Sequence, residues 1–375
     1  MSWANLWIRE WQSLRHHSVA LLTIFGGTLF YSFLYPLPYQ NEVPLEQTIT
    51  VVNMDKSAAS YELERWIDAT PQVKITSRAG SVEESKQQFL DKQVSGILVI
   101  PEHFYRDLLL GKSPTLSLAG DGAYFLVYGT IAEGVSLAAG TMAAKVKIAR
   151  LIIEGESRVS ATSHYSSLSL NVKPTFNSEM GYLNYVVPSI FLFILHQTLL
   201  IGIGILGAGG SRVTSFPKLL VRYLNFMGIY LFLFMYYFGL SFEQLGIHRQ
   251  AEWWQMLMIA ALFISSTSLL GMVIGEMIPH RELVTASVLI ISMPLIFSAG
   301  FIWPIESLPA PVVWLSNLVP STPGIQAFMK LNQQGAPLSG IYPEIELLIW
   351  QALGWGVILF GLTLRKKAPR DCTPA

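Results

Sequence analysis

The second half of the chain alternates long apolar runs with short polar or Pro/Gly-rich stretches. From Met180 to Leu364 the apolar residues are almost continuous. A hydrocarbon core about 30 Å thick needs about 20 apolar residues for each spanning helix. This half supplies five such helices, predicted at 182–208, 219–240, 254–277, 283–302 and 344–364. The pattern therefore predicts an integral membrane protein.

A sixth apolar stretch lies near the N-terminus, at 18–36, after a short segment that contains Arg9 and Arg15. A basic segment before an apolar one is also typical of a cleaved signal peptide. No small-x-small cleavage site follows here, because the sequence continues with Pro36 and Leu37. We therefore interpret 18–36 as a signal anchor and the first of six spans, one plus five.

The distribution of basic residues predicts the orientation, because Lys and Arg in short loops stay cytoplasmic. With an inside N-terminus, the inner segments contain ten basic residues: Arg9, Arg15, Arg212, Lys218, Arg222, Arg281, Arg365, Lys366, Lys367 and Arg370. The two short outer loops contain only Arg249 and Lys330. Both termini, including the tail at 365–375, are therefore expected in the cytoplasm, and the segment 37–179 on the outer side.

The outer segment 37–179 has an ordinary soluble composition and a mixed pattern of strands and helices. Strands are predicted at Gln47–Asn53, Val73–Ser77, Ser95–Ile100 and Pro114–Leu118. Helices are predicted at Ala58–Asp68, from Ser81 to about Lys92, at Glu102–Leu110 and at Ala123–Glu156. Ser81 with Glu84 three residues later fits a capping box. The fold class is thus an α-helical integral membrane protein with an inserted mixed α/β extracytoplasmic domain.

Composition agrees with this assignment, and the net charge does not indicate a particular class of partner. Hydrophobic residues make up 51% of the chain and charged residues 13%, against roughly 25% charged in soluble domains. The formal net charge is zero, and we expect no nucleic-acid partner. Cys372 is the one cysteine, so no intrachain disulfide forms, and a cytosolic tail suits its thiol. We expect no cofactor and no metal.

Several motif-like strings do not support the chemistry they suggest. Gly202–Gly207 spells GxGxxG, but it lies inside a predicted spanning helix instead of between a strand and a soluble helix. Gly111-Lys112-Ser113 lacks the first glycine of a phosphate-binding loop, because Arg106 occupies that position. Gly271 and Gly275 form GxxxG, which fits either a dimer seam or packing within the bundle. No catalytic constellation is found in the outer domain, so a membrane-anchored enzyme is disfavoured.

Polar and kink-forming residues at membrane depth are the candidates for a translocation path. His196 and Gln197 fall midway along the second span, where polar groups need partners or a conduit. An interhelical hydrogen bond without a transport role is the alternative for both. Pro294 lies inside the fifth span, where it removes a backbone hydrogen bond and favours a kink.

The region 303–343 is rich in proline and aromatic residues, which rules out one continuous helix. Aromatic side chains suit the outer membrane interface. We interpret the region as a broken, re-entrant hairpin in the outer leaflet, with Pro320, Pro323 and Gly324 as candidate elements. A simple interfacial loop is the alternative.

The N-terminal segment 1–17 is amphipathic if helical. Its apolar face would contain Trp3, Leu6, Trp7, Trp11 and Leu14, opposite Arg9. The pattern favours an interfacial helix on the inner leaflet, with packing on neighbouring helices as the alternative. A further charge cluster, from Glu276 to Glu282 and including Arg281, is predicted at the inner end of the fourth span, either structural or in contact with a cytoplasmic partner.

The chain as a whole resembles a known family of transporters. One N-terminal span is followed by VVNMDKSAAS at 51–60 and by GILVIPEHFYRDLLLGKSP at 96–114, and five closing spans carry VPSTPGIQAFMKLNQQGA at 319–336. This arrangement resembles the permeases of type-2 ABC exporters that have a large outer domain between the first two spans.

The resemblance implies a transport subunit and not an enzyme. Its partners would be a separate ABC ATPase subunit, a second permease copy or paralogue, membrane lipid and a periplasmic adaptor, and its location a bacterial inner membrane. Relatives often carry a charged segment between the second and third spans where the ATPase docks, whereas 208–215 here contains no acidic residue. The coupling surface is therefore expected at Trp7, Trp11, Arg212, Lys218, Arg281 and Glu282. A permease-like scaffold or assembly factor without ATPase coupling is the alternative function.

Overall fold

The computed structural model describes residues 3–39, 44–165, 176–177, 181–209 and 215–367. The chain forms two compact units. One, called here the helical unit, contains Met1–Glu42 and Pro174–Ala375, and the other, called the α/β unit, contains Val43–Lys173.

The α/β unit contains one sheet of four strands with the order β2-β1-β3-β4. The strands are β1 (Gln47–Asn53), β2 (Val73–Arg78), β3 (Gly96–Ile100) and β4 (Ser117–Gly120). β1 pairs in parallel with β2 and β3, and β4 pairs antiparallel with β3. The helices are α4 (Ala58–Asp68), α5 (Val82–Leu90), α6 (Phe104–Leu109), α7 (Phe125–Ile153) and α8 (Arg158–Tyr165).

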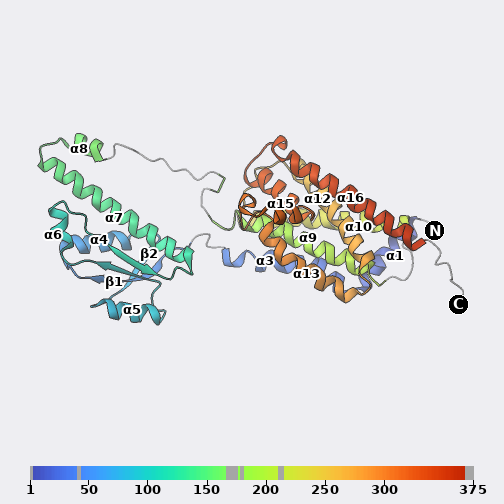
Figure 1. Cartoon of the computed structure of the whole chain (residues 1–375), viewed down its shortest axis with the longest axis horizontal. Coiled ribbons are helices and arrows are strands. Elements are labelled where there is room, and N and C mark those ends of the chain that lie inside the picture. The colour runs from blue at the N-terminus through green and yellow to red at the C-terminus, as the bar shows by residue number, and fades with distance from the viewer. Residues whose placement is uncertain (1–2, 40–43, 166–175, 178–180, 210–214, 368–375) are drawn as a thin grey trace. The chain divides into compact units, whose positions relative to one another are not determined.

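Helices cover both faces of this sheet, as Figure 1 shows. Val51 packs with Leu63 of α4 and Ile131 of α7 in the larger apolar cluster. Val52, the next residue of β1, belongs to the opposite cluster, where Phe89 of α5 packs. Alternate side chains of a strand point to opposite faces, so the run of apolar residues in β1 supplies both layers of the core.

Short polar contacts set the helix starts in this unit. Ser57 accepts a hydrogen bond from the Ser60 amide and begins α4, and Ser81 accepts one from the Glu84 amide and begins α5. The Glu84 carboxylate in turn accepts from the amide of Gly80, one residue before the cap. The predicted cap at Ser81 is confirmed, with Glu84 reaching one residue further back than in a standard capping box.

The predicted last strand, Pro114–Leu118, was placed too early. β4 begins at Ser117, which lies opposite Val99 at the end of the paired register. The residues before it line a pocket and form no ladder, and proline has no amide hydrogen to donate to one. A further helix, α8, was not predicted from the sequence and follows Gly155, which has a positive φ, after the end of α7.

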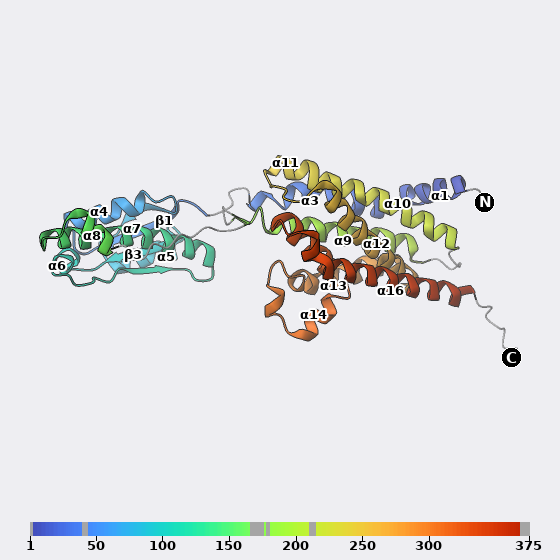
Figure 2. The same cartoon turned by 90° about the horizontal axis from the view of Figure 1, so that it is seen from above.

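The helical unit is a bundle around one long central helix (Figures 1 and 2). Its helices are α1 (Trp3–His16), α2 (Ser18–Leu21), α3 (Thr28–Leu34), α9 (Val186–Gly207), α10 (Phe216–Met235), α11 (Phe242–Leu245), α12 (Trp253–Met277), α13 (Arg281–Ser298), α14 (Ala310–Ser316), α15 (Ser321–Phe328) and α16 (Tyr342–Lys367). A π-helical turn, Leu22–Gly27, joins α2 to α3, and another, Tyr236–Ser241, joins α10 to α11. Nearly every residue of α9 is buried, so this helix is the core of the bundle.

Glycines bring α9 and α12 into close contact. A side chain added at Gly275 of α12 would lie 2.9 Å from the Gly204 carbonyl oxygen and 3.0 Å from the Gly207 Cα of α9. Small residues allow such approach between membrane helices. The GxxxG pattern at Gly271 and Gly275 therefore serves packing within the bundle, the second of the two readings that the sequence left open.

Seven described helices are long and apolar enough to cross a membrane. Six of them, Ser18–Tyr39, Val186–Gly207, Phe216–Leu245, Trp253–Met277, Arg281–Ser298 and Leu338–Leu364, overlap the six predicted spans. The seventh is α7, and its buried residues, such as Ile131 and Val135, pack with the sheet of the α/β unit.

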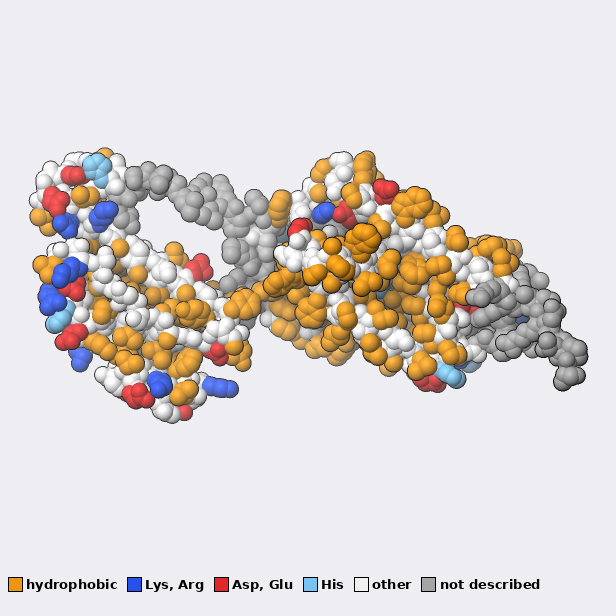
Figure 3. Space-filling view, viewed as in Figure 1, with side chains coloured by type: hydrophobic (Ala, Val, Ile, Leu, Met, Phe, Trp, Pro, Cys, Tyr) orange, Lys and Arg blue, Asp and Glu red, His pale blue; other side chains and the backbone are white. Residues whose placement is uncertain are grey.

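Surface composition separates the two units. In Figure 3, apolar side chains cover most of the visible face of the helical unit, whereas lysine, arginine, aspartate and glutamate gather on the α/β unit. Ile290 and Met293 on α13 are 73% and 68% exposed. Large apolar areas exposed in this way mark lipid-facing or interface surfaces.

Candidate translocation and coupling sites

A buried ion pair joins α1 to α10. The Arg222 Nε lies 3.1 Å from the Glu10 Oε2, and its Nη2 lies 3.3 Å from Oε1. Lys218, one helical turn before Arg222, brings its Nζ to 3.9 Å from Oε1 of the same carboxylate. Leu14 is also buried in the bundle core. One side of α1 is therefore fastened to the bundle.

The arginine at the start of α13 links two other helix ends. Arg281 Nε donates to the carbonyl oxygen of Ala208 at 3.0 Å, directly after α9. Its Nη1 lies 3.0 Å from the Nε2 of His17, the residue between α1 and α2. Neutral imidazole can accept this hydrogen bond and imidazolium cannot. Burial, followed by the charges of Arg281 and His16, lowers the pKa of His17.

The predicted coupling residues gather around these contacts, at the end of the helical unit where α1 lies (Figure 2). Trp11 and Glu282 are exposed, and Trp7 is partly buried. Lys218 takes part in the Glu10 cluster and Arg281 in the contact with α9. Arg212 lies outside the described residues.

His196 is enclosed by aromatic side chains in the middle of α9. It is 1% exposed, and its ring centre lies 6.2 Å from those of Phe193 and Phe263. Neither ring nitrogen has a hydrogen-bond partner among the described residues. Burying an unpaired polar group is costly, so this histidine is not explained by the interhelical hydrogen bond that the sequence offered as an alternative.

Gln197, the next residue, faces a different environment. It is partly buried and lines a groove of about 560 Å³ between the first span, α9 and α13. The other lining residues are Leu22, Thr23, Gly26, Gly27, Phe30, Tyr31, Thr198, Ile201 and Leu289. The groove is largely apolar with a few hydroxyl and amide groups, a composition typical of small-molecule sites.

Pro294 is not part of this groove. It is exposed on α13, and the helix runs through it from Arg281 to Ser298. Of the three candidate path residues, the structure therefore puts one in an enclosed aromatic site, one in an open groove and one on the surface of the helical unit.

The region 303–343 is broken into short helices. Pro320, Pro323 and Gly324 are all buried at or within α15. A side chain added at Gly324 would collide with the ring of Phe263, the residue that also faces His196. The Nζ of Lys330 lies 2.6 Å from the Glu344 carboxylate of α16. The broken segment thus packs into the bundle beside α9 and α12.

Glu10 is the site residue that the sequence analysis missed. It is the one acidic residue before Glu42, and it sits among tryptophans and basic residues. A single carboxylate in a segment that is expected to lie on a membrane indicates that this side chain pairs with a specific basic residue. The positive-inside rule treats Arg222 only as a cytoplasmic positive charge, although this residue lies three residues inside a predicted span.

The fold and these sites define a multi-pass membrane protein with apolar spanning helices and a charged α/β unit. A family profile described as ABC-2 family transporter protein matches residues 18–361. The chain therefore belongs to this family and is an ABC-2 type transporter permease. Such proteins are transport subunits that normally work with an ABC ATPase. A search of curated proteins gave no match.

Proposed function

We propose that this chain is the membrane-spanning subunit of an exporter, with a dimeric translocation path driven by a separate ATPase. The observation that carries the proposal is the gathering of coupling candidates at one end of the helical unit. There Glu10 binds Arg222 and Lys218, and Arg281 contacts both His17 and the end of α9. Movement imposed on α1 or α13 would reach the central helix through these contacts.

Six spans fit this function better than seven. The buried residues of α7 pack with the sheet, and its second half carries Lys145, Lys147 and Arg150, which lipid disfavours. The positive-inside rule then assigns both termini to the cytoplasm and the α/β unit to the outer side. The location would be a bacterial inner membrane, with the α/β unit available to a periplasmic adaptor.

The groove beside Gln197 is the proposed entry to the path. Its wall includes Leu289 of α13, and the neighbouring surface of α13 exposes Ile290 and Met293. A second copy of the chain, or a paralogue, packed on that surface would enclose a path between protomers. The broken segment around Pro320 and Pro323 would close the outer end as a re-entrant element.

The test is co-purification of the full chain with a candidate ABC ATPase from the same organism. We expect the pair to co-elute and ATP hydrolysis to be stimulated by transported compounds. Glu282→Lys reverses an exposed charge on the proposed coupling surface and should weaken association. Glu306→Lys makes the same change at an exposed position after α13 and should leave association unchanged.

Failure of the wild-type pair to associate would remove the exporter function. The permease-like scaffold without ATPase coupling would then account for the same fold. If the two charge-reversal variants associate equally with the ATPase, the exporter function stands, and the coupling surface does not include Glu282.

A further inference from the structure

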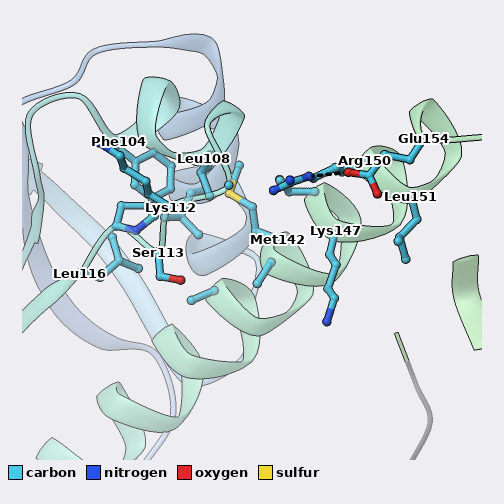
Figure 4. A pocket seen from close by; sticks show the side chains of 16 residues that line it. Phe104, Leu108, Lys112, Ser113, Leu116, Met142, Lys147, Arg150, Leu151 and Glu154 are labelled. Atoms are coloured by element: carbon cyan, nitrogen blue, oxygen red, sulfur yellow. Dashed lines mark hydrogen bonds and ion pairs between the residues drawn. The ribbon is translucent and has the colours of Figure 1, made fainter. Parts of the chain in front are cut away.

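The α/β unit contains its own pocket, with a volume of about 590 Å³. It is lined by Leu63 of α4, Phe104 and Leu108 of α6, the loop Gly111–Pro114, Leu116, residues of the second half of α7 from Ala139 on, and Glu154, which caps the end of α7. Figure 4 shows these side chains. The volume lies within the usual range of small-molecule pockets.

The inner part of the pocket is apolar. Leu63, Phe104 and Met142 are buried in the core cluster of the unit and form its floor. Ala139 and Ala143 of α7 leave space because their side chains are short. From Ala139 to the C-cap Glu154 the lining stretch spans about 22 Å at the rise of an α-helix, which is long enough to accommodate an extended acyl chain.

Basic side chains also line the pocket. Lys112, Lys147 and Arg150 line it, against the single carboxylate of Glu154. Arg150 Nε donates to Glu154 at 2.9 Å, and both side chains are about half exposed. The Arg150 guanidinium therefore retains access to solvent and further hydrogen-bond donors.

Gly111 leaves room for the side chain of Arg150. Its φ of +71° is one that side-chain-bearing residues rarely adopt, and a Cβ there would collide with Nη1 of Arg150. In Figure 4 the Arg150 side chain extends from α7 toward Met142 and Leu108. The loop that only superficially matched a phosphate-binding motif thus borders the pocket with Lys112 and lies next to the guanidinium of Arg150 at Gly111, and a guanidinium suits carboxylate or phosphate groups.

We infer that this pocket binds a single-chain anionic amphiphile, with the chain along α7 and the carboxylate or phosphate at Lys112 and Arg150. An apolar lining alone would accept any hydrophobic molecule, whereas Lys112 and Arg150 favour one with an anionic group. The inference concerns the α/β unit and does not depend on ATPase coupling.

The test uses the full chain in nanodiscs of zwitterionic lipid, photolabelled with a dodecanoate that carries a diazirine near the end of its chain. Peptide mapping should place the label on α6 or α7. Excess dodecanoate and dodecyl phosphate should both compete, and dodecanol should compete weakly. Because charge-assisted hydrogen bonds are the strong ones, Lys112→Gln with Arg150→Gln should lower the apparent affinity by about tenfold or more.

Two further variants separate loss of binding from loss of folding. Lys74→Gln with Lys86→Gln removes two exposed lysines from β2 and α5, outside the pocket, and should leave labelling unchanged. Ala143→Phe retains every charge and should block the chain. Both can be checked for a native elution profile and circular dichroism. Labelling confined to the helical unit, competition by dodecanol equal to that by dodecanoate, or labelling unaffected by the double glutamine variant would overturn the inference.

Discussion

Arg222 holds the carboxylate of Glu10 with two nitrogens, Nε to Oε2 at 3.1 Å and Nη2 to Oε1 at 3.3 Å. Both side chains are 4% exposed. The N-terminal helix is therefore not simply adsorbed to a bilayer, because its one acidic residue forms an ion pair with α10. At the same time Trp3 and Trp11 remain exposed, so part of the surface of α1 is available to lipid or to a partner.

Removing the carboxylate should destabilise the helical unit. In Glu10→Gln the Arg222 guanidinium loses its charge partner while it stays buried, and breaking buried pairs in this way costs about 3–5 kcal/mol. We expect a lower midpoint of thermal unfolding in detergent, followed by tryptophan fluorescence. The matched control is Glu243→Gln at an exposed position, for which no change is expected.

A double variant distinguishes this account from a simple loss of packing. Glu10→Leu with Arg222→Met replaces both charges by apolar groups, which is often neutral or stabilising for a buried pair. The double variant should therefore unfold at a higher temperature than Glu10→Gln. A midpoint lower than that of the single variant would show that the ion pair does not explain the loss.

The seam between α9 and α12 makes a second prediction. In Gly275→Ala the new Cβ would lie 2.9 Å from the Gly204 carbonyl oxygen, in backbone that cannot rotate away, and overpacking of this kind typically costs about 1–3 kcal/mol. Gly354→Ala in α16 meets nothing within 4 Å and should gain up to about 1 kcal/mol from helix propensity. The unfolding midpoints of the two variants should shift in opposite directions. A shift in the same direction would contradict the close packing of α9 on α12.

The periodicity of the sequence predicted most of the fold because local patterns decide most of it. Gln47–Asn53 and Ala58–Asp68 match β1 and α4 to the residue, since β-branched runs and a serine cap are local signals. The start of β4 depends on its pairing with β3, and α7 resembles a membrane span in composition although it packs with the sheet. Tertiary context, which no local pattern contains, decides both.

The candidate sites were less predictable, since they depend on which helices touch. His196 and Gln197 are neighbours in sequence, yet one lies among aromatic rings and the other lines a groove. Successive residues of a helix point about 100° apart, so two neighbouring residues at the same depth in the membrane can face different surroundings. The pairing of Glu10 with Arg222 joins positions 212 residues apart, and only the packing of α1 on α10 reveals it.

Stability should depend on pH through His17. Burial and the neighbouring Arg281 and His16 lower its pKa in the folded protein, so an unfolded chain takes up the proton first as pH falls below the ordinary value of about 6.5. The stabilisation is present above that value and is lost below it. Between about pH 8 and about pH 5, the unfolding midpoint should fall more for wild type than for His17→Gln. His248→Gln, at an exposed position, should follow wild type, and identical pH profiles for all three would refute the role of His17.

The orientation of the chain makes a fourth prediction that uses Cys372. The sequence contains one cysteine, so a thiol reagent reports a single position. In intact spheroplasts a membrane-impermeant maleimide should not label it, and permeabilisation should restore labelling. Moving the cysteine to the α/β unit, as Cys372→Ser with Ser113→Cys, should reverse this result. Efficient labelling of Cys372 from outside would contradict a cytoplasmic tail.

The groove beside Gln197 offers the most direct test of the translocation path. Gln197→Trp would fill part of the 560 Å³ space with an apolar side chain that the walls, such as Phe30 and Leu289, can accept. We expect substrate-stimulated ATP hydrolysis and efflux to fall by about tenfold or more, as expected when a bulky group occupies a ligand's space, while basal hydrolysis and the unfolding midpoint stay near wild type. Val357→Trp adds the same side chain at a 71% exposed position on α16, outside the groove and on a helix that the proposed contact between protomers does not use, and serves as the matched control. Normal stimulation in Gln197→Trp would contradict a path through this groove, and equal loss in both variants would show an effect of the bulky side chain that is not specific to the groove.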